Sequence, residues 1–280
     1  LEKTLDDLYD PYLLKDMDKA VERIKLAHKL NQRVIIFWDY DVDGVTSTSI
    51  LMHFFKKIWM QVSYRLPDRK TDGYWLKKYF IDQVLEVQAS LLITVDCWIK
   101  DFEIVEYANQ KWLDVIITDH HNVPEKIPNA IAVLNPKRND CNYPFSWIAG
   151  VWVAFKLIST LLKEFFPDEK ESKKYLIETL DIVALWTVAD CMNLVDENRI
   201  IVKYWLEQIK KSRSKWIAKL IEDKLEHDLD ADIFWFLIWP KINAAGRLST
   251  PYKAVNLILN NWDNLDEILF EIEDLNTKRK

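Results

Sequence analysis

Glycine is scarce in this chain. It occurs 4 times in 280 residues, about 1.4% where a soluble protein has roughly 7%. Cysteine is scarce too: Cys97, Cys141 and Cys191 form an odd, scattered set with no close pairing. Such a set excludes a disulfide framework and favours a reducing compartment, so we expect a cytoplasmic protein.

Long hydrophobic runs and an excess of positive charge are also missing. No apolar stretch approaches the roughly 18 to 20 residues of a membrane span, and no signal-peptide pattern opens the chain. The net charge of −6 argues against a polybasic nucleic-acid coat. It leaves room for a nucleic-acid enzyme, because a carboxylate-rich metal site is locally acidic and its metal ions restore positive charge.

The first half alternates short β-rich runs with helical patterns, which is typical of βαβ units. Three of the runs are almost continuous in Val, Ile and Leu, as expected for strands covered on both faces. We therefore predict an α/β fold with a parallel five-stranded sheet flanked by helices. The predicted strands are 33–37, 61–66, 91–95, 114–118 and 130–134, and the helices between them are 45–58, 76–87 and 102–111.

The second half is almost wholly helical in pattern. We divide the chain into a catalytic domain, 1–195, and a helical extension, 196–280, that leads into a connector helix. The chain starts with Leu1 and stops in a charged helical stretch, so we expect an excerpt cut at both ends. The predicted helices are 148–165, 170–186, 197–211, 213–223, 251–259 and one from 264 onward.

Acids or histidines follow each of the three most apolar strands. Ligands bind at the carboxyl ends of the strands of an open parallel sheet, so these residues should converge on one crevice. Four or more carboxylates in one place repel each other unless cations hold them. Oxygen ligands with one or two imidazoles favour Mn²⁺ or Mg²⁺. The residues are Asp39, Asp41 and Asp43 after the first strand, Asp96 after the second, and Asp119, His120 and His121 after the third.

Each piece has a simpler interpretation by itself. The Asp-x-Asp-x-Asp-Gly run could open a calcium loop, but position 50, where the closing Glu belongs, is Ile. An Asp-Gly after a strand is usually a turn, and a lone histidine pair is usually structural. A further acid, Asp190, follows a helical run and could be a plain helix end. Three such endings on three core strands are together far more specific.

In combination these motifs resemble the DHH phosphoesterase superfamily, named for the triplet at 119–121. Within it the chain is similar to the RecJ group of single-strand-specific exonucleases, along essentially its whole length. The matching stretches are DMDKAVERI at 16–24, DYDVDGVTS at 39–47, PDRKTDGY at 67–74, TVDC at 94–97, DVIITDHH at 114–121, NPKR at 135–138, LWTVAD at 185–190, ENRI at 197–200 and INAAGRL at 242–248.

The resemblance implies a site for two divalent cations, Mn²⁺ or Mg²⁺. Some relatives carry a histidine where this chain has Phe37, so one metal should lack a ligand. Asp39 and Asp119 would orient the ligands. The implied metal ligands are Asp41, Asp43, Asp96 (bridging both ions), His120 and Asp190, to which His121 is added as catalytic, and the implied contacts to the nucleic-acid backbone or scissile phosphate are Arg69, His121, Asn243 and Arg247.

The implied activity is two-metal hydrolysis of phosphodiester bonds, as a 5′–3′ exonuclease on single-stranded DNA, rather than RNA, in repair and recombination. One alternative is a phosphodiesterase of the same superfamily acting on short oligoribonucleotides or cyclic dinucleotides. Another is a non-catalytic replication scaffold, and Arg69 and Arg247 could be surface ion pairs. Relatives of this type carry a second, glycine-rich domain, to which 267–280 would lead.

Tryptophan is as abundant as glycine is rare, with 13 residues. Almost every Trp stands where the family pattern has, or readily takes, glycine, such as Trp38, Trp98 and Trp186. Together the 4 glycines and 13 tryptophans make 17 of 280 residues, about 6% and close to typical glycine usage. We therefore hypothesise that the gene reads UGA as glycine and that these codons are written here as tryptophan. On this hypothesis the rings of Trp38, Trp98 and Trp186 should crowd the metal crevice or be displaced from it.

Overall fold

The central feature of the computed structural model is a parallel sheet of five strands in the order β2-β1-β3-β4-β5. The structure describes residues 3–38, 42–65, 78–208, 215–222, 237–238, 240–241, 255, 258–259 and 265–279. The predicted α/β fold is confirmed, and each predicted strand is present within a few residues of its expected bounds. The strands are β1 (Arg33–Trp38), β2 (Val62–Arg65), β3 (Ala89–Val95), β4 (Asp114–Thr118) and β5 (Ala132–Leu134).

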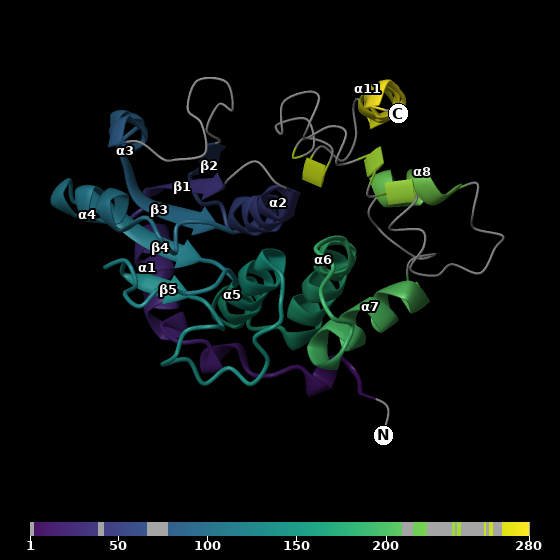
Figure 1. The fold of residues 1–280 in the computed structure, drawn as a ribbon, viewed down its shortest axis with the longest axis horizontal. Coiled ribbons are helices and arrows are strands. Elements are labelled where there is room, and N and C mark those ends of the chain that lie inside the picture. Colours follow the sequence, from purple (N-terminus) through teal and green to yellow (C-terminus); the bar gives the residue numbers. More distant parts are fainter. Residues whose placement is uncertain are drawn as a thin grey trace.

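Helices cover both faces of the sheet (Figure 1). Side chains alternate along the strands, so Ile36 and Ile93 enter one apolar core while Ile35 and Leu92 enter the other. This is why the strands read as continuous apolar runs. The first core is closed by α1 (Met17–Lys29), α2 (Val42–Lys57) and α5 (Gly150–Phe165), and the second by α3 (Lys78–Glu86) and α4 (Phe102–Gln110).

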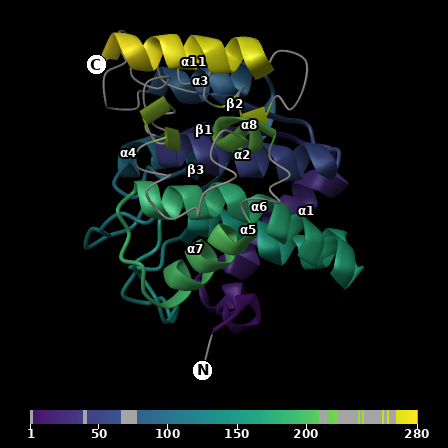
Figure 2. The same ribbon diagram turned by 90° about the vertical axis from the view of Figure 1, so that its right-hand side faces the viewer.

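The rest of the described chain adds helices on the α5 side of the sheet. α6 (Glu169–Ala189) packs against α5 and α2, and α7 (Asp196–Gln208) packs against α6. α8 (Lys215–Ile221) and α11 (Leu265–Arg279) follow, and α11 runs across the top of the molecule in Figure 2. Of the predicted helix 251–259, only 255, 258 and 259 are described. The domain boundary at 195/196 stays a prediction.

Helix α1 was not predicted from the sequence. Its apolar residues Met17, Ala20, Val21, Ile24 and Ala27 are all buried and recur at helical spacing. That periodicity was the signal that could have predicted the helix. Two short 3₁₀ turns, η1 (Leu5–Asp7) and η2 (Pro11–Leu13), precede it. None of the helices in the described part of the chain has both the length and the apolar character of a membrane span.

Candidate metal centre

The carboxyl ends of β1, β3 and β4 lie side by side because the three strands are parallel and in register. Phe37 pairs with Thr94, and Thr94 pairs with Ile117. The residues that follow these strands therefore emerge at one edge of the sheet. Asp96 comes directly after β3, and the Asp-His-His triplet comes directly after β4.

Two further acids reach this edge from helices. Asp43 lies in the first turn of α2, and Asp190 is the residue that ends α6. Asp43, Asp96 and His120 are buried, and Asp190 is half-buried. The structure thus brings together four of the five residues that the sequence predicts as metal ligands.

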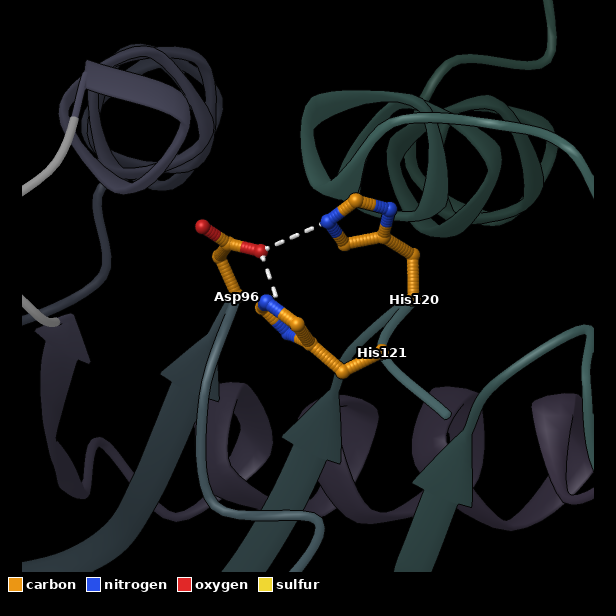
Figure 3. A group of neighbouring side chains, drawn as sticks. All are labelled: Asp96, His120 and His121. Atoms are coloured by element: carbon orange, nitrogen blue, oxygen red, sulfur yellow. Dashed lines mark ion pairs between the residues drawn. The ribbon is translucent and has the colours of Figure 1, made fainter. Parts of the chain in front are cut away.

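The ring of His120 is the meeting point of these acids. Its Nε2 atom lies 3.0 Å from Oδ1 of Asp96, 3.7 Å from Oδ2 of Asp43 and 4.0 Å from Oδ2 of Asp190. Figure 3 shows that the imidazoles of His120 and His121 both point toward the Asp96 carboxylate. Two sets of potential ligand atoms lie within 4.8 Å of one another: Asp96, His120 and His121, and Asp43, His120 and Asp190.

The other nitrogen of His120 determines what Nε2 can do. Nδ1 lies 3.0 Å from the backbone carbonyl of Ile148, which can only accept a hydrogen bond, so Nδ1 carries the proton. Burial, together with the neighbouring His121, lowers the pKa of His120 to about 4. The neutral ring therefore presents a bare lone pair on Nε2 to the carboxylate oxygens, which are also acceptors. Acceptors that face each other in this way are arranged to share a cation.

Asp119 holds the two histidines in place. Its Oδ1 atom accepts hydrogen bonds from the backbone N–H of His120 (2.7 Å) and of His121 (2.9 Å), and lies 2.8 Å from Nδ1 of His121. Oδ2 accepts from the N–H of Ile99 at 3.1 Å. Burial would raise the pKa of Asp119, but the hydrogen bonds and charge of His121 outweigh it and lower the pKa. Asp119 is therefore an ionised anchor for the triplet.

The start of α5 holds Asp43. The N–H groups of Gly150 and Val151 donate to Oδ2 and Oδ1 of Asp43 at 2.6 and 2.8 Å. A β-carbon at position 150 would lie 2.9 Å from Oδ2 of Asp43 and 3.0 Å from Oδ1 of Asp96. Glycine alone leaves room for the two carboxylates at this helix start. Neither Gly150 nor the carbonyl of Ile148 was singled out from the sequence, because neither carries a chemical group that marks a site.

Asp96 itself has an unusual backbone. Its φ angle is 58°, in the left-handed region, and its N–H donates to the carbonyl of Thr118 at 2.9 Å. Aspartate tolerates this region better than most residues, and such backbone strain clusters at functional sites. The turn directs the carboxylate back over the end of β4, toward His120 and His121.

Several predicted site residues lie outside the described residues. His121 is described: its side chain is about half exposed (54%), and Nδ1 lies 3.7 Å from Oδ1 of Asp96. The roles of His121 and of the predicted site residues outside the described part of the chain remain predictions. Those outside the described residues are Asp39, Asp41, Arg69, Asn243 and Arg247.

Comparison with known proteins identifies this arrangement. The N-terminal domain of the DHH family matches residues 33–186, more than half of the chain, and spans β1 to α6. The chain belongs to the DHH family. The matched range contains Asp43, Asp96 and the triplet at 119–121, and Asp190 lies just beyond it.

Relatives of this DHH-family chain include bacterial exonucleases. It is 37% identical over 279 residues to the single-stranded-DNA-specific exonuclease RecJ of Bacillus subtilis, covering 98% of this chain and 34% of that protein. The RecJ of Escherichia coli is 34% identical, with 100% and 50% covered. The chain thus spans half or less of the length of these relatives.

Solved structures of RecJ share the fold. A crystal structure of exonuclease RecJ bound to manganese superposes with a TM-score of 0.82 at 28% identity, covering 95% of this chain and 66% of that one. RecJ from Thermus thermophilus in complex with Mn²⁺ gives 0.78 at 28% identity, with 95% and 38% covered.

Proposed function

We propose that this chain is the catalytic part of a metal-dependent exonuclease that hydrolyses single-stranded DNA in repair and recombination. The observation that carries the proposal is the convergence of Asp43, Asp96, His120 and Asp190 on one edge of the sheet. The relatives named above support it, because they are single-stranded-DNA-specific exonucleases. A cytoplasmic location belongs to the same proposal and fits the three free cysteines.

The donor set fits two divalent cations of the Mn²⁺ or Mg²⁺ type. Carboxylate oxygens and one or two imidazoles suit these ions, whereas thiolates would suit zinc or copper. His120 belongs to both candidate ligand groups, and its Nε2 atom lies 3.0 Å from Oδ1 of Asp96, the residue that the family pattern predicts as the bridging ligand. Asp41 is expected to complete the set. When bound, the ions lower the pKa of a coordinated water and neutralise charge on the reacting phosphate.

The protein's own groups arrange this chemistry. Ile148 holds His120 with Nε2 toward the acids, and the start of α5 holds Asp43. Asp119 fixes Nδ1 of His121, and we place the scissile phosphate against the exposed part of this half-exposed ring. Arg69, Asn243 and Arg247 are the further phosphate contacts that the family pattern predicts.

A nuclease assay tests the proposal. Full-length protein with Mn²⁺ should release the label of 5′-end-labelled single-stranded DNA on a short product, progressively shorten 3′-end-labelled single-stranded DNA, and leave RNA and duplex DNA largely intact. Asp96→Ala should lower the rate by about 10³-fold or more, because it removes a ligand whose loss costs several kcal/mol at the transition state. The matched control Asp18→Ala removes an exposed acid from α1 and should cleave normally. Equal cleavage by the Asp96→Ala protein would refute the proposal.

A further inference from the structure

Three tryptophans have a backbone that side chains disfavour. Trp59, Trp98 and Trp112 have φ angles of 58°, 80° and 60°, in the left-handed region. A β-carbon clashes there with the following carbonyl, and only glycine, with Asn and Asp as occasional substitutes, adopts it readily. Three of the nine such non-glycine residues in the described part of the chain are tryptophan. Tryptophan, at about 5% of the residues, is thus concentrated where glycine is expected.

Trp59 ends α2 in a glycine-type cap. Its N–H donates to the carbonyl of Lys56 at 3.0 Å, and the N–H of Met60 donates to the carbonyl of Phe55 at 2.9 Å. These two bonds form the Schellman motif, whose left-handed residue is usually glycine. The side chain of Trp59 is 90% exposed, so no burial of the ring offsets the strained backbone.

Trp112 ends α4 in the same way. Its N–H donates to the carbonyl of Asn109 at 3.0 Å, and the N–H of Leu113 donates to the carbonyl of Ala108 at 3.0 Å. The ring is 93% exposed. α1 ends in the same motif with Asn31 at the left-handed position, a residue that tolerates this conformation. Tryptophan therefore stands at the usual glycine position of this motif in α2 and α4. In α1 the same position is held by asparagine, an ordinary substitute for glycine.

Trp98 lies two residues after Asp96 and is buried. Its indole nitrogen has no hydrogen-bond partner among the described residues, although an unsatisfied buried N–H is unfavourable. Trp38, at the end of β1, fills the space beside the metal centre: a β-carbon on Gly44 would lie 2.3 Å from its Cδ1 atom. The Trp38 ring thus packs against the start of α2, and the Trp98 ring lies 5.4 Å from that of Phe37 in the second apolar core. Crowding of the metal crevice by Trp38, Trp98 and Trp186 stays a prediction.

We propose that the native protein carries glycine at positions 59, 98 and 112, because its gene encodes them with UGA read as glycine. The remaining tryptophans encoded by UGA follow the same rule. The alternative is a lineage whose proteins are rich in tryptophan in their cores. Tryptophan would then stand where burial stabilises it, as it does in the helices at 152, 205 and 216. Such a lineage would not place fully exposed rings in left-handed helix ends.

The proposal changes the expected metal centre. With glycine at 98, the segment after Asp96 is a glycine turn whose backbone approaches the ligands closely. With glycine at 38, the buried ring that lies against Gly44 at the start of α2 is absent.

The genomic codons and the native protein decide the matter. The codons for residues 59, 98 and 112 should be UGA, and mass spectrometry of peptides from the source organism should show glycine at each position. UGG at these codons, or tryptophan in the peptides, overturns the proposal.

Stability measurements give an independent test. Trp59→Gly and Trp112→Gly in the recombinant chain should each raise the midpoint of thermal unfolding, by about 2–4 °C. Leu30→Gly is the matched control, because Leu30 is also an exposed apolar residue at a helix end but has a φ of −92°. It should show no gain. An unchanged or lower midpoint in both tryptophan variants counts against glycine at these positions.

Discussion

The negative charge of two buried acidic regions of the molecule is compensated in different ways. Glu197, in the first turn of α7, is a single carboxylate surrounded by donors from its own chain. Its Oε1 accepts from Nζ of Lys156 and from the N–H of Tyr9, both at 2.8 Å, and its Oε2 accepts from the hydroxyl of Tyr143. Both Glu197 and Lys156 are almost fully buried.

The candidate metal centre instead gathers several carboxylates around one neutral imidazole. Asp43, Asp96 and Asp190 share the ring of His120 within 4.0 Å. A buried charge is stable only when it is paired or coordinates a metal. Glu197 is paired by the protein and connects the N-terminal segment to α5 and α7. The acids of the metal centre are arranged to be paired by ions, which is why their number exceeds what a structural role requires.

Breaking the Glu197 pair should have the largest effect on stability. Lys156→Met leaves a buried carboxylate without its ammonium and should lower the free energy of unfolding by about 3–5 kcal/mol. Urea denaturation measures this, and Lys163→Met, at an exposed site on the same helix, is the control. The double variant Lys156→Met/Glu197→Gln should recover much of the loss. A loss of less than about 1 kcal/mol in the single variant would contradict the pairing.

Divalent metal ions should stabilise the folded protein by binding at the candidate metal centre. At a free Mn²⁺ concentration of about 100 times its Kd, the free energy of unfolding should rise by about 2.7 kcal/mol, because the ion binds the folded state. Thermal unfolding with and without Mn²⁺ measures the effect. Asp96→Ala should abolish most of it, whereas Lys156→Met should keep it. Equal stabilisation of the Asp96→Ala protein would place the ion elsewhere.

Gly150→Ala should weaken metal binding without removing a ligand. The added β-carbon presses on Asp43 and Asp96, so we expect an affinity about 10 to 100 times lower, as for other groups that orient ligands. Titration with Mn²⁺ followed by electron paramagnetic resonance measures the free ion. Val151→Ala keeps the N–H that Asp43 uses and should bind nearly normally. The idea fails if both variants bind Mn²⁺ equally well.

The smallest expected effect concerns His53, which belongs to neither region. Partial desolvation, together with Lys57, lowers the pKa of His53 below 6.5 although the residue keeps contact with solvent, and Nδ1 contacts the hydroxyl of Tyr175 at 2.9 Å. The unfolded chain takes up a proton at about pH 6.5 and the folded chain only at lower pH. The contribution to stability is therefore complete above about pH 6.5 and is lost as the pH falls toward the folded pKa.

Urea denaturation at about pH 7.5 and pH 5.5, on either side of the unfolded pKa, tests this. His53→Gln removes the titrating group, so the variant should lose less stability than the wild type over this interval. A larger loss of stability in the variant than in the wild type would contradict a lowered pKa of His53 in the folded chain.

Periodicity and strand ends predicted much of this molecule. Continuous apolar runs predict strands covered on both faces, and the acids after 33–37, 91–95 and 114–118 predict one shared edge. The contacts that orient the ligands could not be predicted. Asp43 is held by Gly150, 107 residues away, and His120 by the carbonyl of Ile148. Backbone groups leave no mark in a sequence, so only the folded chain shows where they donate and accept.

The position of Asp190 has a consequence for the order of events during synthesis. The described candidate ligands begin at Asp43 in α2 and end at Asp190 after α6, so the candidate site includes residues from a segment of more than half the chain. Contacts between such distant residues form late in folding, because a long loop must close first. A nascent chain that has not yet produced α6 therefore lacks part of the centre. We therefore expect the full set of candidate ligands to assemble only once the sheet and its covering helices are complete, so the proposed nuclease activity would depend on completion of the fold.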